Sequence, residues 1–122
     1  MITAKCTCSL INWRLINVKF DIEMKVKFLR GFADKTRIQI LECIKDSEKT
    51  VSQIVEELKS SQSNVSQHLA CLKGCGIIVG RQEGKYIYYS LRNQQVRDLL
   101  TMFDVVLEDV QNDVASCERH IV

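Results

Sequence analysis

The amino-acid sequence predicts a mainly α-helical fold with one β-hairpin, and three observations point to it. Apolar residues recur with helical spacing through most of residues 21–76 and again beyond Arg92. Between Ile77 and Leu91 they alternate instead around a central glycine, which indicates a hairpin. Only a few residues separate the third predicted helix from the fourth, as in a helix-turn-helix. The sequence therefore predicts a winged helix-turn-helix.

Length and composition fit one domain in a reducing compartment. The chain has 122 residues, 46% of them hydrophobic, which is enough for a modest core. No apolar run approaches the roughly 20 residues of a membrane span, and the N-terminus lacks the apolar stretch of a signal peptide. We therefore expect a cytoplasmic protein with no membrane partner. Its six cysteines should serve metal or redox chemistry before disulfides.

Charge is unevenly distributed along the chain, although the net charge is only +2. Five basic residues and one acid lie between Lys59 and Arg92, whereas two basic residues and six acids lie between Val96 and Val122. A basic middle segment suits a surface that faces phosphate, and an acidic segment suits a part kept away from it. Ordinary variation of surface charge is the alternative interpretation.

The chain divides into an N-terminal arm and a winged-helix domain. Residues 1–20 show no clear period and are predicted to form a flexible arm, whereas residues 21–122 form the domain. Its first helix is predicted over about residues 21–31, and the next two begin after Asp34 and Thr50, which can cap a first turn. Apolar residues at helical spacing mark all three helices, and in the second they form a buried stripe. The residues of the first helix are expected to contribute to a dimer interface. The three sets are Ile22, Val26 and Leu29; Ile38, Leu41 and Ile44; and Val51, Ile54, Val55 and Leu58.

The fourth helix is predicted between Ser60 and Gly76. Ser60 or Ser61 can cap its first turn, and Gly74 and Gly76 allow it to end in a left-handed turn. Helical spacing gives it a core-facing stripe of Val65, Leu69 and Leu72.

The outer side of this helix suits DNA. Its first two turns present short amides and hydroxyls and no charge: Gln62, Ser63, Asn64, Ser66 and Gln67. Such groups match the hydrogen-bonding base edges of the major groove. Arg81 and Lys85, near the tip of the predicted hairpin, are placed to touch phosphate. Ordinary solvent-facing charge is the alternative interpretation of these two residues.

The last predicted helix begins at Arg92 and has an apolar face wider than one small domain needs. A terminal helix of this kind usually packs on a second copy, so we expect a homodimer with a helical interface. The face consists of Val96, Leu99, Leu100, Phe103, Val106, Leu107 and Val110.

Cys71 and Cys75 lie one helical turn apart. Residues at this spacing share a helix face with Cβ atoms about 5–6 Å apart, which exceeds the roughly 3.5–4.5 Å of a disulfide. The spacing suits two sulfurs that bind one large soft ion, because thiolates select soft metals over magnesium or calcium. Two packed or solvated thiols are the alternative. Cys43 is expected to be a small core residue.

From Phe28 to Leu91 the chain resembles the ArsR/SmtB family of bacterial metal-responsive repressors. The resemblance is carried by FLRGFADKTRIQILECI and SQSNVSQHLACLKGCGIIVGRQEGKYIYYSL, which cover the helix-turn-helix and the wing. The stretch HLACLKGCGIIV is similar to the cadmium- and lead-sensing CmtR branch. This implies a homodimer that binds double-stranded operator DNA and releases it when Cd(II) or Pb(II) binds. Zn(II) is a further candidate ion.

The resemblance also implies a set of metal ligands. Cys71 and Cys75 match two metal-binding cysteines of that branch, and Cys117 is placed like its third, which comes from the other subunit. The predicted third helix, KTVSQIVEEL, lacks the CxC of the arsenic and CadC-like sites. The last helix lacks the Asp/His pattern of the zinc sensors. Both common alternative sites are therefore missing.

Several assignments remain open. Cys6 and Cys8 either add a fourth sulfur or are incidental residues of the arm. In this family His68 would lie next to DNA or at a seam between helices. The alternative functions are an As(III)-responsive repressor that uses the same thiolates, and a non-DNA-binding cytosolic protein for metal buffering or thiol redox chemistry. Catalysis is not expected, because the sequence has no nucleophile with a positioned base and no nucleotide-binding loop.

Overall fold

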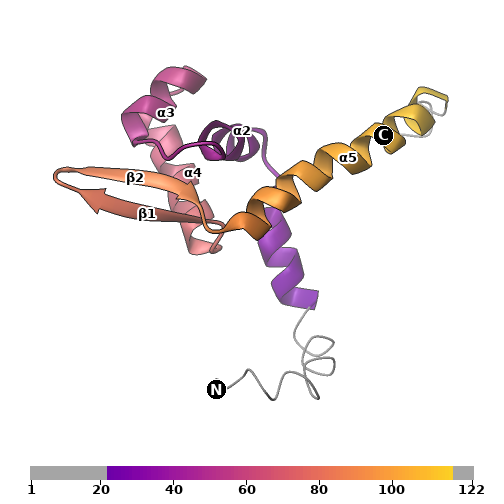
Figure 1. The fold of residues 1–122 in the computed structure, drawn as a ribbon, viewed down its shortest axis with the longest axis horizontal. Helices are drawn as coiled ribbons and strands as arrows, with labels where there is room; N and C mark the ends of the chain where they lie inside the picture. Colours follow the sequence, from indigo (N-terminus) through magenta and orange to yellow (C-terminus); the bar gives the residue numbers. More distant parts are fainter. Residues whose placement is uncertain (1–21, 117–122) are drawn as a thin grey trace, which may run out of the picture.

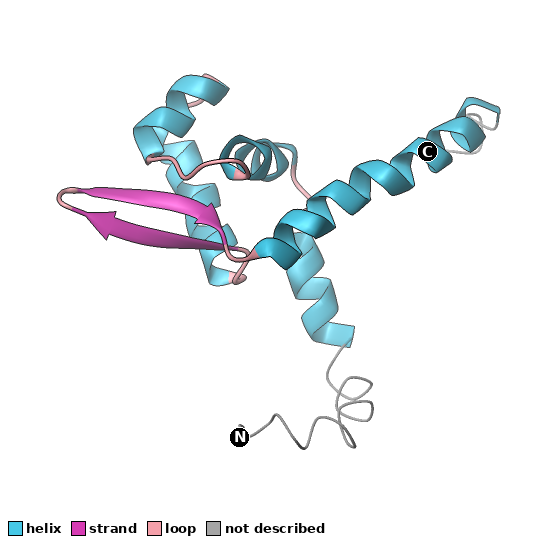
Figure 2. Ribbon diagram, in the orientation of Figure 1, coloured by secondary structure: helices cyan, strands magenta, loops and turns pink. Residues whose placement is uncertain are grey.

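The computed structural model describes residues 22–116 and confirms the predicted mainly helical fold with one hairpin. Figure 2 shows the helices and a two-stranded sheet whose turn projects beyond them. An N-terminal helix over residues 22–30 precedes α2 (Lys35–Ile44), α3 (Val51–Leu58), α4 (Gln62–Gly74), β1 (Ile78–Glu83), β2 (Tyr86–Leu91) and α5 (Gln94–Ser116). The predicted arm, residues 1–20, lies outside the described residues, as do Cys6, Cys8 and Cys117.

Side-chain caps set the starts of the middle helices. Asp34 accepts a hydrogen bond from the backbone N–H of Arg37, and Ser61 accepts one from that of Asn64. Thr50 and Gln53 form a reciprocal capping box at the start of α3. The predicted caps of α2 and α3 are confirmed, and of the two serines considered for α4 the structure uses Ser61.

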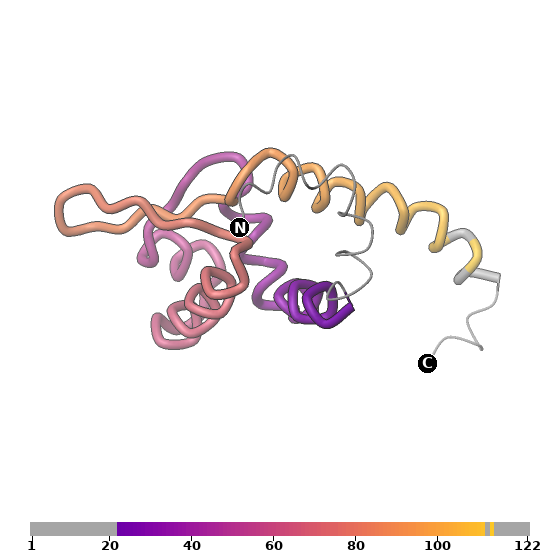
Figure 3. The backbone as a smooth tube through the Cα atoms, turned by 90° about the horizontal axis from the view of Figure 1, so that it is seen from below, coloured from indigo at the N-terminus to yellow at the C-terminus, as the bar shows by residue number. Residues whose placement is uncertain are grey.

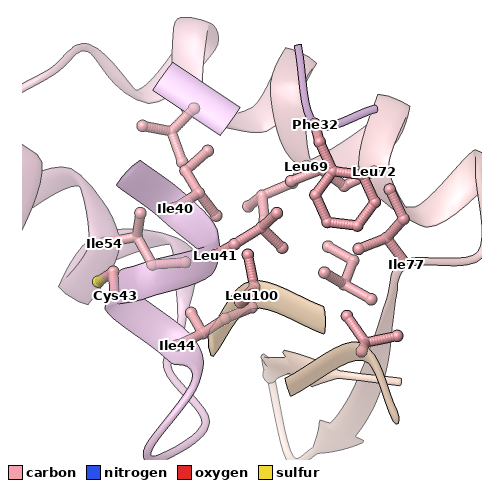
Figure 4. Close-up of a cluster of buried hydrophobic side chains, with 13 residues drawn as sticks. Phe32, Ile40, Leu41, Cys43, Ile44, Ile54, Leu69, Leu72, Ile77 and Leu100 are labelled. Carbon is pink, nitrogen blue, oxygen red and sulfur yellow. The ribbon is translucent and has the colours of Figure 1, made fainter. Parts of the chain in front are cut away.

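Helices α2, α3 and α4 pack into a cluster from which the wing and α5 extend to opposite sides (Figures 1 and 3). The cluster encloses a continuous apolar core, to which α2, α3, α4 and α5 all contribute (Figure 4). Each fully buried aliphatic side chain contributes about 1.5–3 kcal/mol to stability. The largest are Ile40, Leu41, Ile44, Ile54, Leu69, Leu72, Ile77, Ile78 and Leu100. The predicted α4 stripe lies within this core.

The wing is a β-hairpin tied to the helices at its base. Its strands pair from Ile78 opposite Leu91 to Glu83 opposite Tyr86, so the turn consists of Gly84 and Lys85. Gly84 occupies that turn with φ +64°, a conformation that favours glycine. At the base, Lys49 and Tyr89 exchange two backbone hydrogen bonds of 3.0 and 2.8 Å. The loop between α2 and α3 therefore pairs with the outer edge of β2.

Helix α5 begins two residues later than predicted, because Asn93 provides its cap by accepting a 3.0 Å hydrogen bond from the N–H of Val96. The start of its apolar face is buried on the core at Val96 and Leu100. Farther along, this chain leaves it uncovered, and Leu107 is 52% exposed. Nowhere in residues 22–116 does a helix have the length and apolar character needed to cross a membrane.

Candidate functional site

The first turns of α4 present an exposed polar surface, which we call the recognition face: Gln62, Ser63, Ser66 and Gln67. Asn64, also predicted to face DNA, is instead half-buried. Its side-chain amide donates a 3.0 Å hydrogen bond to the hydroxyl of Ser60, next to the helix cap. Four of the five predicted side chains are thus exposed to solvent, and the fifth also helps to hold the start of the helix.

His68 lies at the seam between α4 and α2, which is one of the two positions expected for it. Its Nδ1 is 3.3 Å from a guanidinium nitrogen of Arg37, and its Nε2 is 3.9 Å from a carboxylate oxygen of Asp34. The pKa of Asp34 is lowered, first by the backbone hydrogen bond from Arg37 and also by the nearby His68. The imidazole is therefore placed between an arginine and a helix-capping carboxylate.

The two wing cations have different surroundings. Arg81 donates to both carboxylate oxygens of Glu48, at 3.2 and 2.5 Å, and to Glu83 at 2.6 Å. These carboxylates raise the pKa of Arg81, with Glu48 the larger cause. Lys85 stands in the turn, with its ammonium 5.7 Å from the centre of the Tyr86 ring. Two acids thus compensate the charge of Arg81 before any phosphate approaches.

The thiols of Cys71 and Cys75 lie together at the C-terminal end of α4. Cys75 is the residue that caps this end, and its N–H donates a 3.0 Å hydrogen bond to the carbonyl of Cys71. Cys71 is exposed and Cys75 half-buried. Burial, followed by the neighbouring Cys71, raises the pKa of Cys75. The Cys75 sulfur also lies 4.0 Å from the carbonyl of Lys27 in the N-terminal helix.

This thiol pair fits part of a soft-metal site. One sulfur is open to solvent and its partner lies one turn away, so both could reach one ion. A groove of about 470 Å³ adjoins Cys75 and is lined also by Phe28, Arg92 and Val96. Within residues 22–116 no three potential ligands gather into a metal cluster. A third protein ligand would therefore have to come from residues outside this range or from a second chain.

Cys43 behaves as the core residue that the sequence predicts. It is 8% exposed, and burial followed by a hydrogen bond with Glu57 raises its pKa to about 11. A thiol that resists ionisation in this way is a poor metal ligand.

The sequence did not indicate Arg37 as a functional residue. Its guanidinium contacts α4 and the end of the N-terminal helix at once. Its partners lie up to 31 residues away, and neither its spacing nor its neighbours in the sequence signal these contacts.

Comparison with known proteins gives the family. Residues 34–79 match the bacterial regulatory protein, arsR family. A probable mercury resistance operon repressor of Streptomyces lividans is 36% identical over 76% of this chain and 74% of its own length. The transcriptional regulator CmtR of Mycobacterium tuberculosis is 39% identical over 64% of this chain and 67% of its own.

Solved structures agree with this assignment. A homodimeric winged helix-turn-helix DNA-binding domain from Mycobacterium bovis superposes with a TM-score of 0.69 at 25% identity, covering 72% of this chain and 82% of its own. Reduced HlyU from Vibrio cholerae gives a TM-score of 0.66 at 29% identity, covering 74% and 95%. The chain therefore belongs to the arsR family of bacterial regulatory proteins, which are transcriptional regulators and not enzymes.

Proposed function

We propose that this protein is a cytoplasmic, homodimeric repressor that releases its operator DNA when a soft metal ion binds its thiolates. One observation carries the proposal: the Cys71–Cys75 thiol pair and the recognition face occupy opposite ends of the same helix, α4. An ion held at one end of a rigid helix can therefore change the placement of the other. Similarity to the probable mercury resistance operon repressor of Streptomyces lividans supports a metal response.

The proposed ligands are Cys71, Cys75 and Cys117, and the proposed inducers are Cd(II) and Pb(II). Three thiolates suit these large soft ions better than they suit magnesium or calcium. As(III) is the second candidate inducer because it could use the same three sulfurs. Parallel titrations with Cd(II), Pb(II), As(III) and Zn(II) would separate these ions. A protein that only buffers metal would bind them without any effect on DNA.

The homodimer is proposed from the uncovered apolar surfaces. The N-terminal helix and the outer part of α5 both expose large aliphatic side chains, among them Leu29, Val106 and Leu107 at 51–52%. A groove of about 450 Å³ between these helices is lined by Phe32, Leu100, Phe103 and other apolar residues. Exposed apolar surface on this scale commonly marks a protein interface. A symmetric dimer would present two recognition faces to a palindromic operator.

The proposed function is tested by DNA binding with and without metal. The 122-residue chain is titrated onto a duplex from its own promoter and onto a scrambled duplex, and fluorescence anisotropy is recorded before and after adding Cd(II). We expect specific binding that is lost with the metal. Equal affinity for both duplexes, or specific binding that no thiophilic ion changes, would contradict the proposal.

The recognition face gives a prediction about base specificity. Replacing Ser66 or Gln67 by alanine should cost about 1–3 kcal/mol of operator affinity and relax the preference at one base pair, because a base-edge contact is lost. Gln39→Ala is the matched control, since Gln39 is exposed on α2. Binding to a set of single-base operator variants measures the effect. A uniform loss over all variants would mean that these side chains do not read bases.

The wing gives a prediction about salt dependence. Lys85→Ala should weaken binding to all sequences alike and lower the slope of log affinity against log salt by about one, because one phosphate contact is lost. Glu48→Gln should have the opposite effect, since it frees part of the charge of Arg81 for phosphate. Affinity is measured over a range of salt concentrations. If Glu48→Gln left the slope unchanged, the release of Arg81 from Glu48 would not contribute to DNA binding.

A further inference from the structure

The side chain of Arg37, on α2, contacts both the end of the N-terminal helix and α4. Its Nε donates a 3.1 Å hydrogen bond to the carbonyl of Gly31, and its Nη2 donates a 2.9 Å bond to that of Arg30. Carbonyls at the end of a helix lack partners within the helix and accept hydrogen bonds from outside it. The Arg30 carbonyl also accepts a 3.2 Å bond from the N–H of Ala33. The same guanidinium lies 3.3 Å from His68 Nδ1 on α4 through its Nη1. It therefore joins the end of the N-terminal helix to α4.

The contact on α4 lies between the two functional ends of that helix. His68 follows the last residue of the recognition face, Gln67, and precedes Cys71 by about one helical turn. Its ring is also held from α2 by Asp34, the residue that caps that helix. A rotation or shift that begins at the thiol end of α4 must pass this point to reach the recognition face.

The thiol end contacts the same N-terminal helix directly. The Cys75 sulfur lies 4.0 Å from the Lys27 carbonyl. Gly31 is packed so closely that a Cβ there would lie 2.4 Å from Ile77 Cδ1 and 3.6 Å from Cys75 Cβ. Helix α4 is thus attached to the N-terminal helix at two places, directly beside Cys75 and through Arg37 at His68. A metal ion that binds Cys75 would alter the contact between Cys75 and Lys27. The contact between Arg37 and His68 would then determine how α4 moves in response.

We propose that Arg37 is a positioning residue that transmits metal binding at the thiol pair to the recognition face, and this rests on the proposed function. It acts by holding α4 at His68 against the end of the N-terminal helix. The role requires a guanidinium, because a planar fork with five N–H donors can bind two carbonyls and a ring nitrogen together. A lysine ammonium is a single point and cannot span all three acceptors.

The test compares Arg37→Lys with a matched arginine, Arg97→Lys. Arg97 also donates to the main chain just past the end of a helix, at the carbonyl of Lys45, and it pairs with Asp46 at 3.1 Å. It lies in α5, and these partners lie just past the end of α2. The two substitutions therefore remove similar hydrogen bonds, but only Arg37→Lys disturbs the link to α4.

Three quantities are measured on the 122-residue chain: operator affinity with and without Cd(II), Cd(II) affinity from the thiolate charge-transfer absorption, and the thermal unfolding midpoint. Coupling between two sites typically changes an affinity by about 5–150-fold. We expect Arg37→Lys to bind Cd(II) as the wild type does, while the ratio of operator affinities without and with Cd(II) falls about fivefold or more. Arg97→Lys should keep the wild-type ratio of operator affinities, even if it lowers the unfolding midpoint as much as Arg37→Lys does.

Two further variants settle the matter if Arg37→Lys does not fold. His68→Leu removes the acceptor on α4 while Arg37 keeps both carbonyls, and His68→Gln supplies a new acceptor oxygen. The ratio of operator affinities without and with Cd(II) should fall in His68→Leu and recover in His68→Gln. A wild-type ratio in Arg37→Lys, or equal ratios in the two His68 variants, would overturn the inference. A wild-type protein that keeps its operator in Cd(II) would instead refute the proposed function, before any variant is compared.

Discussion

Serine at Cys71, Cys75 or Cys117 should leave operator binding intact and abolish its loss on addition of Cd(II). Each substitution removes one of three proposed sulfur ligands, and a hydroxyl is a poor ligand for a soft ion. Operator titrations with and without Cd(II) measure the response. Cys43→Ala is the matched control, because Cys43 is buried in the core and its pKa is raised to about 11. A serine variant that still released DNA would exclude that cysteine from the site.

A mixed dimer tests whether the site is shared between subunits. One subunit carries Cys71→Ser with Cys75→Ser, and the other carries Cys117→Ser. If the third sulfur comes from the partner, the Cys117→Ser chain keeps the thiol pair, the double mutant supplies Cys117, and one complete site forms. If all three sulfurs belong to one chain, none forms. High-affinity Cd(II) is counted by titration, with both mutant homodimers shown to be folded. Absence of such binding would exclude the shared site.

Leu107→Glu should convert the protein to a monomer and weaken operator binding by roughly 10²–10⁴-fold. Leu107 continues the side of α5 that buries Val96 and Leu100, yet it is 52% exposed in a single chain. A carboxylate there would be costly to bury in a dimer. A monomer engages one half-site at a time and loses the avidity of the second, which gives the expected range.

Val105→Glu is the matched control for this prediction. Val105 is 49% exposed and lies half a turn around α5 from Val96, since nine residues at 3.6 per turn make two and a half turns. Sedimentation velocity gives the oligomeric state, and anisotropy gives the operator affinity. If Leu107→Glu stayed dimeric while Val105→Glu dissociated, the interface would lie on the opposite side of α5.

Features set by neighbouring residues could be predicted from the sequence. At each of the caps Asp34, Thr50 and Ser61, a side-chain oxygen accepts a hydrogen bond from the backbone N–H three residues later in the sequence. The buried stripe of α4 follows from helical spacing, and the hairpin from alternation around Gly84. Helical spacing and the family resemblance both indicated the thiol pair, and the structure places Cys71 and Cys75 at one helix end.

Features that depend on distant residues could not be predicted. The pairing of Arg81 with Glu48 spans 33 residues, and a basic side chain at a wing tip gives no sign that an acid elsewhere will reach it. The contact between Arg37 and His68 spans 31 residues and depends on how α2 and α4 cross. Local spacing also could not show that the Asn64 side chain donates a hydrogen bond to Ser60.

The pairing of Lys49 with Tyr89 gives the wing a gradient of stiffness along its length. At the base three chain segments share backbone hydrogen bonds, while at the tip only the two strands do. We therefore expect amide hydrogens at the base to exchange with solvent more slowly than those near the turn, which can open locally. The wing is thus held in place at its base and more mobile at its turn. Lys85, in the turn, can therefore move relative to Tyr89, which is held to the body of the domain by its pairing with Lys49.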